Sequence, residues 1–183
     1  MKNILILGGA GFIGSNIVKL FVEKKYNVTV IDGLLKNSGG DIENISKWLD
    51  KINFIDKRIE DVDDLSIIFN NNEIIVDSMA WTCHLSAIKD PFFDLELNVK
   101  SHLYLLEQIK KYDIHPDKII YLGSRSQYGN PSRLEIDENT SMTPLDIQGI
   151  HKLTAENYYR IFSEIHNLNI ISLRMVGVFG NND

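Results

Sequence analysis

A glycine-rich run near the N-terminus has the residue types and the spacing of a loop that holds phosphate groups. Gly8, Gly11 and Gly14 stand three residues apart in LILGGAGFIG, between an apolar run and a segment of helical period. Glycines allow a tight turn there and let the backbone approach a pyrophosphate, while the N-terminus of the following helix offers free N–H groups and a partial positive charge. This pattern predicts a loop that binds a dinucleotide.

An acid at the end of the next apolar run indicates which dinucleotide to expect. Asp32 follows the run NVTVI and precedes a stretch rich in turn residues, DGLLKNSGGD. A carboxylate at the end of the second strand can accept hydrogen bonds from the adenosine ribose hydroxyls, and it repels a 2′-phosphate. We therefore expect NAD as the cofactor, in preference to NADP.

The rest of the chain has the pattern of a scaffold that would position these residues. Short runs rich in Ile and Val alternate with longer segments of helical period, which is typical of βαβ units and a parallel sheet covered on both faces. We expect strands at residues 3–7, 28–31, 53–55, 74–77, 118–122 and 170–174, helices at 13–24, 63–70, 94–111 and 149–166, and a loop between the fourth strand and residue 94. The predicted fold is a single α/β domain over residues 1–183, a Rossmann-type doubly wound parallel sheet.

Composition limits the partners and the location. The 183 residues are 44% hydrophobic and 24% charged, which suits one well-buried core. The formal net charge is -6 with acids and bases interspersed, so no basic stripe is present and no nucleic acid is expected as a partner. Cys83 is the single cysteine, which excludes an internal disulfide and a multi-cysteine metal site, and no metal is expected. No apolar run is long enough for a secretory or membrane segment, so we expect no membrane contact and a cytoplasmic location.

Asp32 and five segments in a fixed order resemble one family. The segments are GGAGFIGSN, DLELNVKSHLYLLEQIKK, YLGSRSQYG, GIHKLTAENYY and SLRMVGVFG. Together they resemble the extended short-chain dehydrogenase/reductase family, in particular its NAD-dependent nucleotide-sugar epimerases and dehydratases. Members of that family usually continue into a small substrate-binding domain, so the resemblance implies a C-terminal substrate domain that is missing from this sequence.

The resemblance implies an NAD site and a nucleotide sugar as partner. Such enzymes oxidise a sugar hydroxyl, commonly at C4, by hydride transfer to NAD, and then return the hydride. The residues at the family's cofactor-binding positions are Gly8, Gly11, Phe12, Ile13, Gly14, Asp32, Ile59, Ala80, Asn98 and Lys152. Two positions differ from the family pattern, Arg58 where an aspartate is usual and Ser78 where a histidine is common. The helices at 94–111 and 149–166 match those through which family members dimerise, so a homodimer is implied.

The resemblance also implies a Tyr-x-x-x-Lys pair, in which the lysine lowers the tyrosine pKa and holds the nicotinamide ribose. Lys152 matches that lysine, but Gln148 stands at the tyrosine position. A carboxamide does not titrate near neutrality, so Gln148 cannot serve as the general base. Asp146, Gly149 and Lys152 also resemble a D-x-x-G-x-x-K arrangement found in a subset of such sequences.

Ser124 matches the family's active-site serine or threonine, whose hydroxyl hydrogen-bonds the reacting sugar oxygen. The residues after it, Arg125 and Ser126, differ from the Asp-Glu pair of the dehydratases and from the glutamate of the decarboxylases. This difference favours epimerisation or simple oxidoreduction.

The group that replaces the tyrosine stays open at the level of sequence. The candidates are Tyr128, His84, His151 and Tyr158. His84 has the most support, because it follows the fourth strand at the carboxyl edge of the sheet, where ligands of open α/β folds bind. We therefore predict an epimerase-type enzyme with Ser124, Lys152, Gln148 and His84 in its active site. The alternatives are an NAD-binding module without turnover, acting as a sensor or structural partner, and a simple carbonyl reductase.

Overall fold

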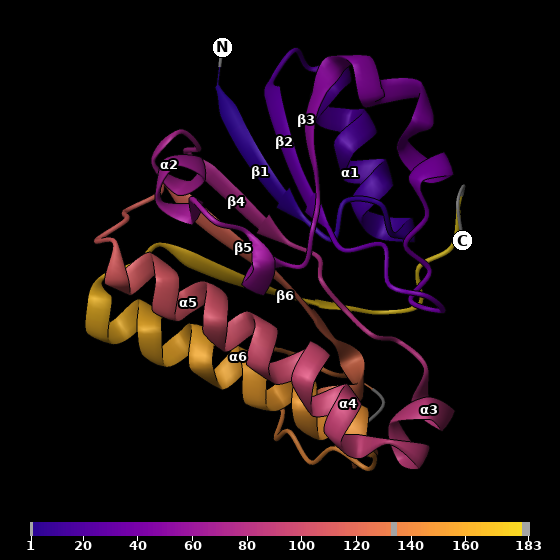
Figure 1. The fold of residues 1–183 in the computed structure, drawn as a ribbon. Coiled ribbons are helices and arrows are strands. Elements are labelled where there is room, and N and C mark those ends of the chain that lie inside the picture. The colour runs from indigo at the N-terminus through magenta and orange to yellow at the C-terminus, as the bar shows by residue number, and fades with distance from the viewer. Residues whose placement is uncertain (1, 133–134, 181–183) are drawn as a thin grey trace.

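Six strands form one sheet in the computed structural model, which describes residues 2–132 and 135–180 (Figure 1). They are β1 (Asn3–Leu7), β2 (Asn27–Asp32), β3 (Ile52–Asp56), β4 (Ile74–Asp77), β5 (Lys118–Ser124) and β6 (Ile170–Met175). Their spatial order is β3-β2-β1-β4-β5-β6, and every neighbouring pair is parallel. The order runs outward from β1 and β4 in both directions, which confirms the predicted Rossmann-type doubly wound sheet.

Helices cover the two faces of the sheet. One face carries α1 (Phe12–Glu23) and the 3₁₀ turns of η1 (Ile42–Lys51), and the other carries α2 (Leu65–Asn70), α5 (Ser101–Lys111) and α6 (Ile147–His166) (Figure 1). In β1, Ile4 and Ile6 pack with the α1 side, whereas Leu5 and Leu7 pack with α5 and α6. Because the strand is buried on both faces, its sequence is apolar without alternation. None of the helices in the described ranges has the length and apolar character needed to cross a bilayer.

The strand order changes direction between β1 and β4. The chain leaves β1 into α1 on one face of the sheet and leaves β4 toward the helices of the other face (Figure 1). Two connections that diverge in this way leave a crevice at the carboxyl ends of the strands. The predicted glycine loop lies at this edge, in the turn between β1 and α1.

The segment after β4 is helical, so the expectation of a loop there was wrong. It forms α3 (His84–Lys89) and α4 (Pro91–Leu95). Asp90 caps α4 by accepting a hydrogen bond from the Phe93 amide at 3.0 Å, and Pro91 suits the first helical position. α4 then continues through a π-helical turn, η3 (Glu96–Lys100), into α5. The helix expected at residues 94–111 is therefore the later part of a longer helical segment.

The face that carries α1 is open over the last two strands. Ile171 and Leu173 of β6 lie beside Ile120 and Leu122 of β5 in the sheet register. Ile171 is 39% exposed and Leu173 is 44% exposed. α1 packs over β1 and β2 instead (Figure 1). Within the described ranges, no helix covers this apolar strip, which we call the β5–β6 strip.

Truncation of a central strand residue should test the packing. Ile6→Ala should lower the free energy of unfolding by about 2–5 kcal/mol, because the side chain is fully buried and its loss leaves a cavity. Urea denaturation followed by circular dichroism measures the change. Ile67→Ala in α2 is the matched control, because Ile67 is 59% exposed and its truncation should cost less than about 1 kcal/mol. Equal losses in the two variants would contradict this description of the core.

Candidate active site

The glycine loop is shaped by close contacts between backbone atoms. Gly8 has φ +72°, and a Cβ there would lie 2.9 Å from the Met79 amide nitrogen. A Cβ on Gly14 would lie 2.1 Å from the Gly8 carbonyl oxygen, so the first turn of α1 packs directly against the end of β1. Gly11 differs, because the nearest atom to its added Cβ is the Gly8 oxygen at 3.5 Å. The side of Gly11 that faces the crevice is therefore open.

The N-terminus of α1 faces the crevice without a side-chain cap. Gly11 is the N-cap, no side chain caps the helix, and the first turn contains no acidic residue. The first N–H groups of a helix lack partners within the helix, and they attract negative charge. A pyrophosphate fits this end in both charge and hydrogen bonding.

Asp32 is fixed at the end of β2 by the glycine loop itself. Its Oδ2 accepts a hydrogen bond from the Ala10 amide at 2.9 Å, and its Oδ1 accepts one from the Leu34 amide at 2.9 Å. Burial raises the pKa of Asp32 above its ordinary value, although these two hydrogen bonds oppose the shift. The carboxylate lines the pocket beside Gly8 and Gly11, where it retains lone pairs for ribose hydroxyls.

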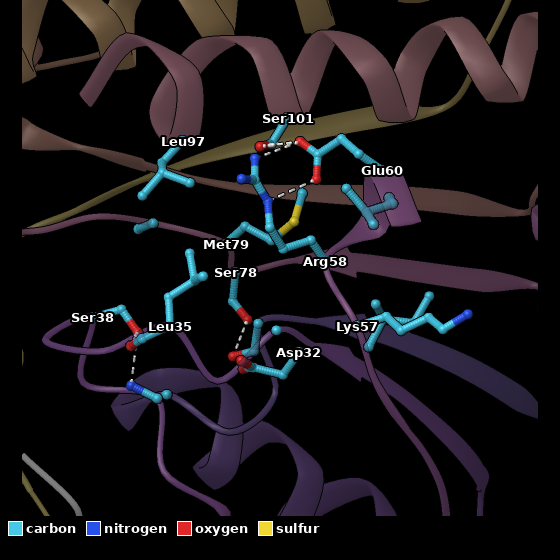
Figure 2. Close-up of a pocket in the computed structure, with 17 residues that line it drawn as sticks. Asp32, Leu35, Ser38, Lys57, Arg58, Glu60, Ser78, Met79, Leu97 and Ser101 are labelled. Carbon is cyan, nitrogen blue, oxygen red and sulfur yellow. Dashed lines mark hydrogen bonds and ion pairs between the residues drawn. The ribbon is translucent and has the colours of Figure 1, made fainter. Parts of the chain in front are cut away.

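Figure 2 shows the pocket beyond Asp32. Arg58, which stands where the family usually has an aspartate, points there toward Glu60 and Ser101. The Arg58 guanidinium lies 3.3 Å from Glu60 and 2.8 Å from Glu96, and the Ser101 hydroxyl donates to Glu60 at 2.5 Å. The other basic residue of the lining, Lys57, pairs with Asp63 at 2.8 Å. Both cations are therefore neutralised by acids of the protein, which leaves the pocket without the free positive charge that a 2′-phosphate needs.

A second pocket lies on the other side of β4, at the carboxyl ends of β5 and β6. It brings together six residues that the sequence placed in the site: Phe12, Ile13, Ala80, Ser124, Gln148 and Lys152. Thr82, Met175 and Val176 complete much of its wall. Ser78 and Ala80 line both pockets, so the two lie next to each other at the end of β4.

Ser124 ends β5 and begins the short 3₁₀ turn η4 (Arg125–Tyr128). Its Oγ accepts hydrogen bonds from the Ser126 amide at 3.2 Å and from the Ser126 hydroxyl at 2.9 Å. Gln127 completes this capping box and is fully buried, with its amide donating to Glu156 at 2.7 Å. Because both lone pairs of Ser124 Oγ are engaged, its hydroxyl hydrogen is available to a ligand in the pocket.

Gln148 is held by the segment that follows β4. Its Nε2 donates to the Trp81 carbonyl oxygen at 2.7 Å. Asn98 holds the backbone of the same residue at both ends, with its Nδ2 donating to the Trp81 carbonyl oxygen at 2.9 Å and its Oδ1 accepting from the Trp81 amide at 3.1 Å. Asn98 is fully buried, so its amide braces the wall of the pocket and does not line it.

Lys152 lies one helical turn after Gln148 and is 4% exposed. Its Nζ is 3.5 Å from the Met79 carbonyl oxygen and 5.5 Å from the centre of the Tyr121 ring. Burial lowers the pKa of Lys152 to about 8, although the negative charges of Asp77 and Asp94 act in the opposite direction. The environment of Lys152 therefore brings its pKa closer to neutrality than that of an exposed lysine.

The other candidates for the missing base do not line either pocket. His84 lies 3.0 Å from Asp146, the residue that caps α6 through the Gly149 amide. His151 pairs with Asp94 at 2.6 Å, and the Tyr128 hydroxyl accepts a hydrogen bond from Arg174 at 2.5 Å. Tyr158 packs against the hydrophobic core. Each of these side chains is already engaged away from the crevice.

Sequence reasoning missed the side chains beneath Lys152. Asp77, His102, Tyr121 and Tyr159 form a buried cluster that connects β4, β5, α5 and α6. One signal was present, because an aspartate ends the apolar run of β4 at the carboxyl edge of the sheet. Among the described residues, no group of three or more His, Cys, Asp or Glu side chains could hold a metal ion.

The fold and the crevice define a class, the dinucleotide-binding α/β proteins with a serine and a lysine beside the cofactor site. The sequence profile of the NAD dependent epimerase/dehydratase family matches residues 4–183. The chain belongs to this family.

Several relatives in that family are similar over nearly the whole chain. A Methanocaldococcus jannaschii protein, provisionally named a UDP-glucose 4-epimerase, is 34% identical over 179 residues, which are 97% of this chain and 56% of that protein. The crystal structure of a UDP-glucose 4-epimerase from Brucella ovis in complex with NAD has a TM-score of 0.84 and 27% identity, over 95% of this chain and 51% of that one. A UDP-glucose 4-epimerase from Thermotoga maritima, with UDP-glucose, has a TM-score of 0.83 and 31% identity, over 94% and 54%. This chain thus spans about half the length of the curated relatives it matches.

Two alanine substitutions should distinguish Gly14, which has no room for a side chain, from Gly11, which has room for one. Gly14→Ala should lower the free energy of unfolding by about 2–4 kcal/mol, because its Cβ would overlap the Gly8 carbonyl and force the helix away from β1. Gly11→Ala should change it by less than about 1 kcal/mol, because the added methyl group meets no atom closer than 3.5 Å. Chemical denaturation of both variants gives the comparison. A larger loss for Gly11→Ala would contradict the described loop.

Proposed function

We propose that the protein is an NAD-dependent nucleotide-sugar epimerase-type enzyme that transiently oxidises a sugar hydroxyl at C4. The main support is that the pocket of the glycine loop and Asp32 shares a wall, Ser78 and Ala80, with the pocket of Ser124 and Lys152. Relatives that are named UDP-glucose 4-epimerases support this reaction and this class of substrate. The absence of an Asp-Glu pair after Ser124 is consistent with epimerisation and not with dehydration.

The residues of the chain fit NAD along the whole crevice. The glycine loop and the N-terminus of α1 would bind the pyrophosphate, and Asp32 would bind the adenosine ribose. Ile59 and Ala80 would flank the adenosine half. Phe12, Ile13 and Lys152 would contact the nicotinamide half, with the lysine beside the second ribose. NAD supplies the chemistry of reversible hydride acceptance at that end.

Lys152 is our proposed proton acceptor in place of the tyrosine. Of the described residues that line the second pocket, it alone carries a group that titrates near neutrality. As the carbon that bears the sugar hydroxyl is oxidised, the hydroxyl proton would pass to the neutral Lys152 amine, with the Ser124 hydroxyl as donor or relay. When the ketone is reduced again, the Lys152 ammonium would return the same proton to the sugar oxygen, so the lysine ends the cycle in the state in which it began.

One observation favours a second function, that of an NAD-binding module without turnover. The amide of Gln148 is engaged with Trp81 and cannot titrate, so the position usually occupied by the base has a structural role here. A protein that senses NAD, or that NAD stabilises, needs only the cofactor half of the crevice.

The homodimer and the cytoplasmic location stay predictions. α6 presents Ile161 and Ile165, which are 37% and 69% exposed, on a helix that the family resemblance assigns to the dimer interface. A nucleotide sugar is the proposed partner, and we expect no contact with nucleic acid or membrane.

Calorimetric titration with NAD and NADP tests the cofactor half. We expect NAD to bind at least about tenfold more tightly than NADP, because Asp32 lies at the ribose end and the nearby cations are paired. Gly11→Ala should weaken NAD binding at least about tenfold without loss of fold, because its methyl group would project toward the pyrophosphate. NAD affinity that is unchanged in Gly11→Ala would exclude this loop as the phosphate site.

Replacement of Gln148 tests the catalytic half in the full-length natural protein. With saturating NAD and a panel of nucleotide sugars, NADH formation in a single turnover should rise as the pH passes through about 8, because the neutral Lys152 amine is required. Gln148→Tyr should raise the rate at pH 7 by about 10²-fold, because it supplies a phenol beside the Lys152 ammonium.

Gln148→Phe is the matched control for this substitution, because it fills the same space and provides no hydroxyl. If Gln148→Tyr and Gln148→Phe behave alike, the missing base is not what limits the reaction. If NAD binds and no sugar is oxidised by any variant, the module without turnover is the better description.

A further inference from the structure

A carboxylate is buried under the active-site lysine. Asp77 ends β4 and has no exposed surface. Its Oδ2 accepts a short hydrogen bond from the Tyr159 hydroxyl and lies 2.7 Å from His102 Nδ1, while its Oδ1 accepts from the Met79 amide at 3.0 Å. Burial acts to raise the pKa of Asp77, but the contact with His102 and the two hydrogen bonds outweigh it, so the pKa lies below its ordinary value. Asp77 is therefore ionised.

The other members of the cluster are buried ring side chains. His102 Nε2 is buried and has no hydrogen-bond partner in the described part of the chain. Burial raises the pKa of Tyr159 and of Tyr121 well above the ordinary value, so both phenols stay neutral. Neither tyrosine therefore adds a charge beside the Asp77 carboxylate.

Lys152 is the cation that faces the Asp77 carboxylate. Met79 connects the two groups, because its amide donates to Asp77 Oδ1 and its carbonyl oxygen lies 3.5 Å from Lys152 Nζ. The Tyr121 ring stacks on Tyr159 with 4.5 Å between centroids, and Lys152 Nζ lies over that ring. A buried carboxylate and an aromatic face both favour the ammonium form of a buried lysine.

Two other acids lie near Lys152, and each of them also contacts a base. Asp94 of α4 is buried and pairs with His151 at 2.6 Å. Glu156, one turn further along α6, pairs with Arg174 at 2.6 Å. Asp94 also favours the Lys152 ammonium, but its effect is smaller than that of Asp77. Asp77 is consequently the strongest single source of negative charge opposite the lysine.

We propose that Asp77 is a positioning residue for the active site, that it supplies the buried negative charge opposite Lys152, and that His102 and Tyr159 hold its carboxylate in this role. The charge on Lys152 decides whether the side chain donates to a ribose or accepts a proton. Asp77 would thereby set the pH at which the lysine changes between these two tasks. The assignment of those tasks depends on the proposed function, whereas the coupling between Asp77 and Lys152 does not.

Nuclear magnetic resonance of lysine side chains labelled at Cε measures the coupling without cofactor or substrate. The Lys152 signal is assigned by its loss in Lys152→Met. In the wild-type protein it should titrate near pH 8. In Asp77→Asn, the midpoint should fall by about one pH unit or more, because the buried ammonium loses its main counter-charge. Asp63→Asn is the control, because Asp63 is an exposed acid paired with Lys57, and it should leave the midpoint unchanged.

A midpoint that is the same in Asp77→Asn and in the wild-type protein would overturn the proposal. Should Asp77→Asn fail to fold, the reciprocal experiment replaces it, because a coupling between two sites is equal in both directions. Lys152→Met should then raise the pKa of Asp77, followed through the labelled aspartate Cγ, by about one pH unit or more. An unchanged Asp77 titration would overturn the proposal in that case.

Titration with NAD at pH 7 and pH 9 connects the coupling to the proposed function. If Lys152 holds the ribose as an ammonium ion, affinity should fall between these two pH values, and in Asp77→Asn the fall should begin at a lower pH. If the wild-type protein binds no NAD, the proposed function fails, and the lysine titration still decides the role of Asp77.

Discussion

The contact between Gly14 and the Gly8 carbonyl is the constraint on which the crevice depends. It brings the first turn of α1 against the end of β1, so the free N–H groups of the helix lie at the carboxyl edge of the sheet. Asp32 then ties β2 to the same loop through the Ala10 amide, and the Ser78 hydroxyl ties β4 to it by donating to the Leu7 carbonyl at 2.6 Å. Three strand ends are thereby held around the glycine loop. A side chain at Gly14 would separate them.

A second close approach fixes the pocket that contains Ser124 and Lys152. A Cβ on Gly149 would lie 2.8 Å from the Ser126 carbonyl oxygen, so α6 begins in contact with the turn that Ser124 caps. Asp146 starts the helix at this point by accepting from the Gly149 amide at 2.7 Å. The serine and the lysine therefore face the same pocket because two backbones touch. This contact gives Asp146 and Gly149 of the D-x-x-G-x-x-K pattern a structural role that does not require either residue to contact a substrate.

The parts of the structure that depend on local sequence were predictable, and those that depend on distant pairs were not. β1 and β4 are apolar runs whose burial on both faces gives a clear signal, and the glycine loop has a spacing that few other structures need. α3 and α4 were missed because each is too short for helical periodicity to show, although Asp90 and Pro91 marked a helix start. The Asp77 cluster was missed because its members are far apart in sequence and meet only when β4, α5 and α6 pack together. That Gln148 cannot act as a base stays a prediction from its chemistry, whereas its bond to Trp81 could be seen only in the structure.

The open β5–β6 strip has a consequence for how the stability of this unit should be understood. Ile171 and Leu173 lie on the last strand of the sheet, whose outer edge has no neighbouring strand in the described residues. When a segment or another chain covers an apolar surface beside an open strand edge, the free energy of the folded state falls. A covering partner that binds only the folded state raises the free energy of unfolding by RT ln(1 + [L]/Kd), where [L] is the concentration of the free partner and Kd its dissociation constant. The stability of this unit is then a function of the concentration and affinity of what covers it, and not a fixed property of the 183 residues.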